Sequence, residues 1–264
     1  MSTPLIPEQR QQELLRMLRD AGVLSTRGLT EAMNVSHMTI RRDIAALEAA
    51  GQVVAVQGGV RLAGGASVEP PRERATRSTL EVPSKAAIAK AAADHVQNGM
   101  VIFLDAGTTC EVVVPHLSER SGLTVVTSDF HAVELLVPLV HIDVIHTGGL
   151  LDRDRSSANG PLAAATVRSL GIDLCLMSTG TWDVAHGISV PVADTALLKQ
   201  AALEVSAKTM LLADSTKFGA FERYRVAPLQ DLDRIITDDR LTAEARNDIE
   251  STGATLELVA ARRD

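Results

Sequence analysis

The feature that most constrains the fold is an alternation of short β-prone segments with longer helical segments across residues 84–259. Such alternation is typical of an α/β domain with a mainly parallel sheet, because each parallel crossover needs a helix-length connection. The expected strands are 101–104, 124–127, 144–146, 174–177, 210–213, 234–237 and 255–259. The expected helices are 84–97, 110–119, 130–137, 161–170, 192–206 and 243–251.

Small hydroxylic residues, glycine and aspartate follow one expected strand after another. The loops are Asp105–Thr109, Thr127–Asp129, Thr147–Gly149, Ser178–Gly180 and Asp214–Lys217. The carboxyl ends of parallel strands form the ligand crevice of such sheets, and glycine lets backbone amides approach a ligand. Hydroxyls and carboxylates suit a polyol, and lysine suits a phosphate. These loops predict a pocket for a small, phosphorylated, hydroxyl-rich ligand.

Each of these loops also has a plainer interpretation. The Gly-Thr-Thr turn at residues 107–109 is also what a simple helix cap looks like. Asp214 is equally suited to capping a turn, and Lys199 to a solvated helix surface. Trp182 suits either a cover over a ligand or a surface anchor. Because five such loops follow successive expected strands, and so lie at the same edge of the sheet, the pocket is the favoured interpretation.

The first sixty residues have the pattern of a winged helix-turn-helix. Helices are expected at 7–21, 26–33 and 36–50, followed by a short hairpin over residues 52–62. In this arrangement the N-terminal end of the last helix enters the major groove of DNA. Arginine can read guanine, and serine or threonine can bind phosphate or bases. The candidate DNA-binding residues at this helix start are Ser36, His37, Thr39, Arg41 and Arg42.

A polar segment with Pro70, Pro71 and Pro83 separates the two patterns. It predicts a DNA-binding domain at 1–62, a linker at 63–79 and an effector-binding domain at 80–264. The net charge of −7 argues against a protein that is basic all over, but not against a local DNA-binding face. Aromatic residues make up only 2% of the chain, which argues against base stacking on single strands.

Several other classes of protein are disfavoured by the residues. Cys110 and Cys175 form no Cys-x-x-Cys motif, and the seven histidines form no metal-binding pattern, so neither a metal nor another cofactor is expected. Charged residues and Pro138 interrupt the longest apolar stretch, 132–144, so no membrane association is expected. The N-terminus lacks a signal-peptide pattern. We therefore expect a cytoplasmic protein.

The stretch VSHMTIRRDIAALEAAGQVV, residues 35–54, resembles the DNA-binding signature of the DeoR family of bacterial transcription regulators. The matching residues are Ser36, Thr39, Ile40, Arg41, Arg42, Asp43, Leu47, Glu48 and Gly51. The wing departs from the family: Ala55 stands where an arginine is usual, and Gln57 where a histidine is usual. Gln57 is the candidate DNA-binding residue of the wing.

The C-terminal segments LDAGTT (104–109), LADSTKFG (212–219) and IITD (235–238) resemble the sugar-phosphate-binding sensor domain of the same family. That domain is similar in fold to ribose-5-phosphate isomerase. The resemblance implies the effector-binding residues Lys85, Asp105, Gly107, Thr108, Thr109, Thr127, Gly148, Gly149, Thr179, Gly180, Lys199, Asp214 and Lys217. Asp129 departs from the family and adds a negative charge near the expected anion.

These observations predict a DNA-binding regulator, a repressor of an operon for carbohydrate uptake or catabolism. Its expected partners are double-stranded operator DNA, a phosphorylated sugar and further copies of itself in a dimer or tetramer, since two-fold operators need paired readers. The alternative is an isomerase-like enzyme acting on a sugar phosphate, for which Asp105, Glu111, Asp214 and Lys217 are nominal groups. No paired constellation demands catalysis, so no catalytic residue is assigned.

Overall fold

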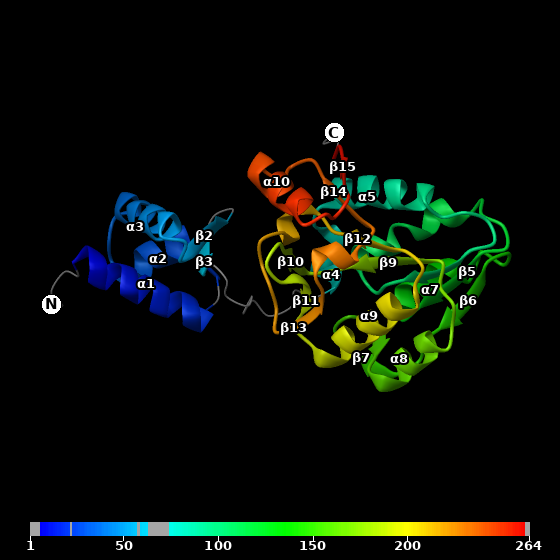
Figure 1. Ribbon diagram of the computed structural model, residues 1–264. Helices are drawn as coiled ribbons and strands as arrows, with labels where there is room; N and C mark the ends of the chain where they lie inside the picture. The colour runs from blue at the N-terminus through cyan, green and yellow to red at the C-terminus, as the bar shows by residue number, and fades with distance from the viewer. Residues whose placement is uncertain (1–5, 22, 57–58, 63–73, 262–264) are drawn as a thin grey trace. The chain divides into compact units, whose positions relative to one another are not determined.

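The structure, a computed structural model, describes residues 6–21, 23–56, 59–62 and 74–261. The chain divides into two compact units, Met1–Pro71 and Arg72–Asp264 (Figure 1). Each unit has its own hydrophobic core.

The first unit is a three-helix bundle with a small antiparallel sheet. Its elements are α1 (Pro7–Ala21), β1 (Val23–Ser25), α2 (Thr26–Met33), α3 (His37–Ala49), β2 (Val53–Val56) and β3 (Gly59–Leu62). The sheet has the order β1-β3-β2, so the expected wing hairpin is confirmed. β1 is too short to leave a periodic signal and was not expected. Leu14 and Leu18 of α1, Leu29 of α2 and Ile40 of α3 are fully buried and form the core of this unit.

The second unit is built on a sheet of seven strands, and every pair of neighbours is parallel. The order is β15-β14-β12-β9-β4-β5-β6. The strands are β4 (Val101–Leu104), β5 (Thr124–Thr127), β6 (Asp143–His146), β9 (Leu174–Ser178), β12 (Thr209–Leu212), β14 (Arg234–Asp238) and β15 (Leu256–Val259). The expected mainly parallel α/β domain is confirmed. The chain reverses its direction across the sheet between β4 and β9, where parallel sheets open a crevice for ligands.

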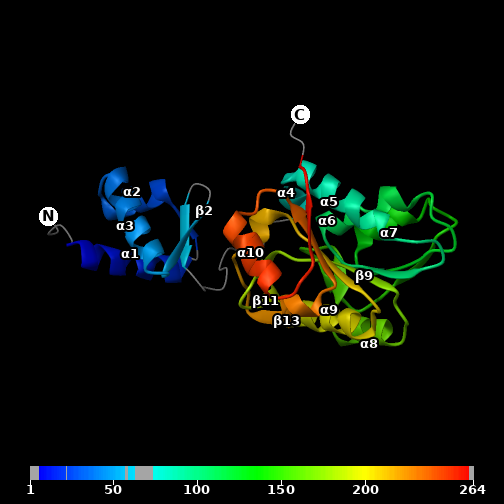
Figure 2. The same ribbon diagram turned by 45° about the horizontal axis from the view of Figure 1, so that its top comes forward.

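Helices cover both faces of this sheet (Figures 1 and 2). One face carries α5 (Val82–Asp94), α6 (Thr108–Glu111), the 3₁₀ helix η1 (Val114–Leu117) and α7 (Phe130–Leu136). The other carries α8 (Pro161–Arg168) and α9 (Ala193–Val205). The side chains of Ile102 and Leu104 in β4 pack in the core on the α5 face of the sheet. The side chain of Phe103, between them, packs in the core on the α9 face. Because both faces of the sheet are covered, side chains pointing to either face are apolar, and the β-prone segments are continuous apolar runs in the sequence. α10 (Ala243–Ser251) precedes β15.

Two expectations about the second unit were wrong. The helix expected over 110–119 ends early as α6 and resumes only as η1, because Pro115 has no N–H and cannot continue an α-helix. The sequence pattern also missed a small antiparallel sheet of β10 (Thr181–Asp183), β11 (Gly187–Val190) and β13 (Tyr224–Ala227). Trp182 lies in β10, fully buried against Phe218, and is neither a cover nor a surface anchor.

Further short elements complete the unit. β7 (Leu150–Asp152) and β8 (Ser157–Asn159) form a hairpin, and η2 (Ser215–Lys217) and η3 (Leu229–Asp231) are 3₁₀ turns. Residues 63–73 of the expected linker lie outside the described residues. Its remaining part, Arg74–Thr79, is the helix α4, which packs on α6 and thus belongs to the second unit, called the sensor unit below after the resemblance noted above.

Candidate functional site

The N-terminal end of α3 is the candidate DNA-reading surface. Ser36 caps the helix by accepting a hydrogen bond from the Thr39 amide at 3.2 Å, and the two hydroxyls lie 2.8 Å apart. His37, Arg41 and Arg42 are exposed along the first turns. The hydroxyls of Ser36 and Thr39 therefore hold the helix start, while the three longer side chains face solvent. Gln57, the candidate of the wing, lies outside the described residues.

Asp43, which follows the two exposed arginines, has a different role. Its carboxylate is buried and accepts hydrogen bonds from the Arg10 guanidinium of α1, one of them at 3.0 Å. The hydrogen bond and charge of Asp43 raise the pKa of Arg10 despite burial. The Arg-Arg-Asp motif thus combines two outward cations with one inward anion that fixes α3 to α1.

In the sensor unit, Asp105 at the end of β4 is paired with Lys199 of α9. Both side chains are buried, and their ion pair is joined by Ser178 at the end of β9. The Asp105 carboxylate accepts from the Ser178 amide at 2.9 Å and from its hydroxyl at 3.1 Å. Lys199 also donates to the Ser178 carbonyl at 2.9 Å. Lys199 is therefore no solvated surface residue, and three segments distant in sequence meet between β4 and β9.

The Gly-Thr-Thr loop after β4 is tied to the loop after β5. The Gly107 amide donates to Asp129 Oδ2 at 3.0 Å, and a Cβ at residue 107 would lie 2.5 Å from the Ser178 hydroxyl. Asp129 also caps α7 by accepting from the His131 amide at 2.8 Å. Arg74 of α4 reaches the same oxygen, Asp129 Oδ2, at 3.5 Å, and forms a second ion pair with Glu111 of α6. Local donors thus balance the charge of Asp129.

Cations gather where α4, the start of α5 and η2 meet. The buried Lys85 donates from its ammonium group to the carbonyl oxygen of Arg77. Burial lowers the pKa of Lys85, and the nearby charges of Lys217 and Arg77 lower it further, against the charge of Asp214. Burial also lowers the pKa of Arg77, and the charges of Arg155 and Arg74 add to this. These like charges repel one another, and the charges of Asp129, Asp152 and Asp214 offset part of that repulsion.

Arg74, Arg77 and Arg155 were missed by sequence reasoning. The first two lie in the segment expected to be a linker, and Arg155 lies between two strands that were not expected. No spacing in the sequence connects these positions with Lys85 or Lys217.

The remaining candidates occupy varied positions. Thr108 and Thr109 are buried at the start of α6, and Thr127 is buried, with its hydroxyl accepting from the Asp129 amide at 3.1 Å. The Thr179 hydroxyl donates to the Thr181 carbonyl at 2.8 Å and so closes the turn into β10. Asp214 caps η2 through the Thr216 amide at 3.1 Å, as the plainer interpretation held. The glycines 148, 149 and 180 are exposed in their loops.

Two buried hydroxyls at the carboxyl edge of the sheet have no hydrogen-bond partner among the described residues. They belong to Ser128, directly after β5, and Thr237, near the end of β14. Buried polar groups are nearly always paired in native proteins, so these hydroxyls require an explanation. The strands β12, β9 and β4 lie between these two positions, so one small ligand cannot be the partner of both.

Two carboxyl groups near this edge have shifted pKa values. Burial opposes the charge of Asp238, but hydrogen bonds from Arg240 and Ser215 outweigh it and lower its pKa to about 2. Burial raises the pKa of Glu222 to about 7, because the charges of Arg155 and Arg223 oppose it only partly. Glu222 therefore changes its charge near neutral pH.

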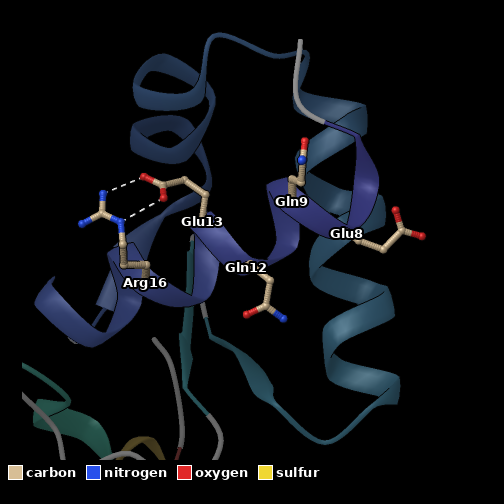
Figure 3. A pocket seen from close by; sticks show the side chains of 5 residues that line it. All are labelled: Glu8, Gln9, Gln12, Glu13 and Arg16. Atoms are coloured by element: carbon tan, nitrogen blue, oxygen red, sulfur yellow. Dashed lines mark hydrogen bonds and ion pairs between the residues drawn. The ribbon is translucent and has the colours of Figure 1, made fainter. Parts of the chain in front are cut away.

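Two other hollows lie in the described chain, and one of them, between α9 and β13, is lined by Asp194, Gln200, Arg223, Tyr224 and Arg225 among others. The hollow in Figure 3 is lined by side chains of the single helix α1: Glu8, Gln9, Gln12, Glu13 and Arg16. One helix cannot surround a ligand. Within the described ranges, no group of three His, Cys, Asp or Glu side chains could hold a metal ion, and no helix is long and apolar enough to cross a membrane.

Known proteins give matches to both units. A profile described as "DeoR-like helix-turn-helix domain" matches residues 10–64, and one described as "DeoR C terminal sensor domain" matches residues 81–239. The HTH-type transcriptional regulator YgbI of Escherichia coli (strain K12) is 42% identical over 91% of this chain and 93% of its own. The transcriptional repressor AccR of Agrobacterium fabrum is 31% identical over 88% and 89%.

A ribose 5-phosphate isomerase A from Neisseria gonorrhoeae matches 55% of this chain and 56% of its own, with 16% identity and a TM-score of 0.39. The matched families are those of regulators, so the expectation of a regulator rather than an enzyme is confirmed. The chain belongs to the DeoR family of helix-turn-helix transcription regulators.

Proposed function

We propose that this protein represses an operon for carbohydrate uptake or catabolism, and that a phosphorylated sugar changes its affinity for operator DNA. The observation that carries the effector class is a group of cations beside the hydroxyl-rich loops of the sheet edge: the buried Lys85 donates to the Arg77 carbonyl, and Lys217 lies near it. Arg155 lies near Arg77 as well, paired with Asp152 at 3.0 Å. Cations that repel one another in the free protein gain most from a phosphate dianion.

The sugar moiety would lie toward the neutral part of the same edge. The unpartnered hydroxyl of Ser128, after the strand next to β4, supports this, because a sugar hydroxyl both donates and accepts hydrogen bonds. The Asp105–Lys199 pair holds the ends of β4 and β9 together, since its buried groups already bind one another and Ser178.

We further propose that α4 connects effector binding with DNA binding. α4 is the first described element after the residues that join it to the DNA-binding unit, and it carries both Arg74 and Arg77. Arg74 and the Gly107 amide share the acceptor Asp129 Oδ2. An effector that binds Gly107 or Arg77 would change the position of α4, and with it the arrangement of the DNA-binding units.

A regulator of this kind acts on the chromosome, in the cytoplasm. It works as a homo-oligomer, a dimer or tetramer, because one helix-turn-helix reads only half of a two-fold operator.

The test is fluorescence anisotropy of the DNA upstream of the gene, titrated with the full chain at fixed salt against random competitor DNA. A panel of phosphorylated sugars is then added, with the unphosphorylated sugars as controls. Specific binding that one sugar phosphate releases supports the repressor. Binding that a sugar phosphate strengthens contradicts this sign of regulation, and equal binding to random DNA contradicts the function.

The anion site is tested by Lys217→Ala, with Lys208→Ala as the matched control. Lys208 is exposed and directly precedes β12, at the opposite end of that strand from η2. We expect Lys217→Ala to bind the operator normally but to need far more of the sugar phosphate for release. An unchanged response would remove Lys217 from the site.

A further inference from the structure

Met38, the second residue of α3, has an exposed side chain. It is 73% exposed, whereas the other large aliphatic residues of the helix, Ile40, Ile44 and Leu47, are at most 7% exposed. Exposing so large an apolar side chain does not stabilise the free protein, because its burial away from water would be favourable. A role in a complex would explain it.

The direction of Met38 follows from helix geometry. Successive side chains of an α-helix are about 100° apart, so residues three or four apart share a face. The buried residues Ile40, Ile44 and Leu47 define the inner face. Met38 lies on the opposite face, one turn before Arg42, and exposed Ala45 continues that face. This outward strip at the N-terminal end of α3 is the part that enters the major groove in helix-turn-helix proteins.

The chemistry of the groove limits what Met38 can contact. Donors and acceptors cover the base edges, and the apolar group among them is the C5 methyl of thymine. The neighbouring hydroxyls of Ser36 and Thr39 contact each other and cap the helix, and Met38 is the large apolar side chain exposed at this end of α3.

We propose that Met38 is a specificity-determining residue that reads thymine through its C5 methyl group. The proposal rests on the proposed DNA-binding function, and it specifies thymine as one of the bases that the protein recognises in its operator. Arg41 and Arg42 supply contacts to guanine or phosphate beside it.

The experiment uses duplexes that the full chain selects from a random library. Each thymine of the selected duplex is replaced in turn by deoxyuridine, which lacks only the methyl group, and affinity is measured by anisotropy at one salt concentration. For the natural protein we expect about a fourfold loss at one or two positions of each half-site, the value of one buried methyl group. For Met38→Ala we expect no loss at those positions.

Two controls separate base reading from structural damage. Met38→Leu keeps an apolar side chain and should keep the uridine penalty, and Ile6→Ala changes another exposed apolar residue of this unit, 55% exposed, and should leave it unchanged. A natural protein that is indifferent to every uridine, or a Met38→Ala variant that keeps the full penalty, would overturn the proposal. A selection that enriches no duplex would instead overturn the DNA-binding function on which it rests.

Discussion

The buried pair between Arg10 and Asp43 predicts a large, local effect of removing the carboxylate. The two side chains are 8% and 3% exposed and joined by two hydrogen bonds, and Asp43→Ala removes both bonds and the carboxylate charge from a shielded guanidinium. Breaking a buried pair in this way costs about 3 kcal/mol. The stability of a unit of this size is on the order of 5 kcal/mol, so most of it would be lost.

Amide hydrogen exchange on the full chain measures this effect residue by residue. A loss of about 3 kcal/mol corresponds to roughly 160-fold faster exchange. We expect this acceleration in α1 and α3, with no change in β4 and β9 of the sensor unit. Operator affinity should fall with the stability of the first unit, although Asp43 contacts no DNA.

The chain offers a matched control in Glu31, which pairs with Arg27 on α2 at 3.0 Å but is 66% exposed. Glu31→Ala should accelerate exchange by less than about threefold, because exposed pairs contribute little. The double variant Arg10→Met, Asp43→Leu should restore most of the protection, since apolar residues can replace a buried pair. The reasoning is refuted if Asp43→Ala behaves like Glu31→Ala, or if the double variant is as unstable as Asp43→Ala.

Three further predictions concern the sensor unit. Arg74→Ala should bind operator DNA and the sugar phosphate within about threefold of the natural affinities, but release should need at least tenfold more sugar phosphate; normal release would exclude the α4 route. Asp238 has a folded pKa of about 2, below the unfolded value near 4, so it stabilises the unit above pH 4 and this contribution is lost as the pH falls toward 2. Asp238→Asn should therefore lower urea stability by about 2 kcal/mol at pH 7 and flatten its decline below pH 4; an unchanged slope would contradict this. Glu222 ionises near pH 7 beside Arg155, so the natural protein should bind the sugar phosphate more weakly than Glu222→Gln at pH 8 and equally at pH 6, as calorimetry would show.

Much of the fold follows from local patterns. All seven parallel strands lie within one residue of their expected bounds, because such strands are short apolar runs between turn residues. The capped helices α2 and α3 were also predictable, since Ser25 and Ser36 mark their starts. The small sheet of β10, β11 and β13 was not, because its strands are short and β13 pairs with β11 from a distant part of the chain.

The candidate site also has features that local sequence patterns predict and features that they do not. The sequence by itself determined the loops at the carboxyl ends of the strands and the outward arginines of α3, because strand and helix periods are local. Only the tertiary structure decided that Asp43 faces inward to Arg10, that Lys199 is buried on Asp105, and that Arg74 belongs to the sensor unit. The physical reason is that an ion pair depends on which charges approach in three dimensions, and no residue spacing along the chain records a partner 33, 94 or 55 positions away.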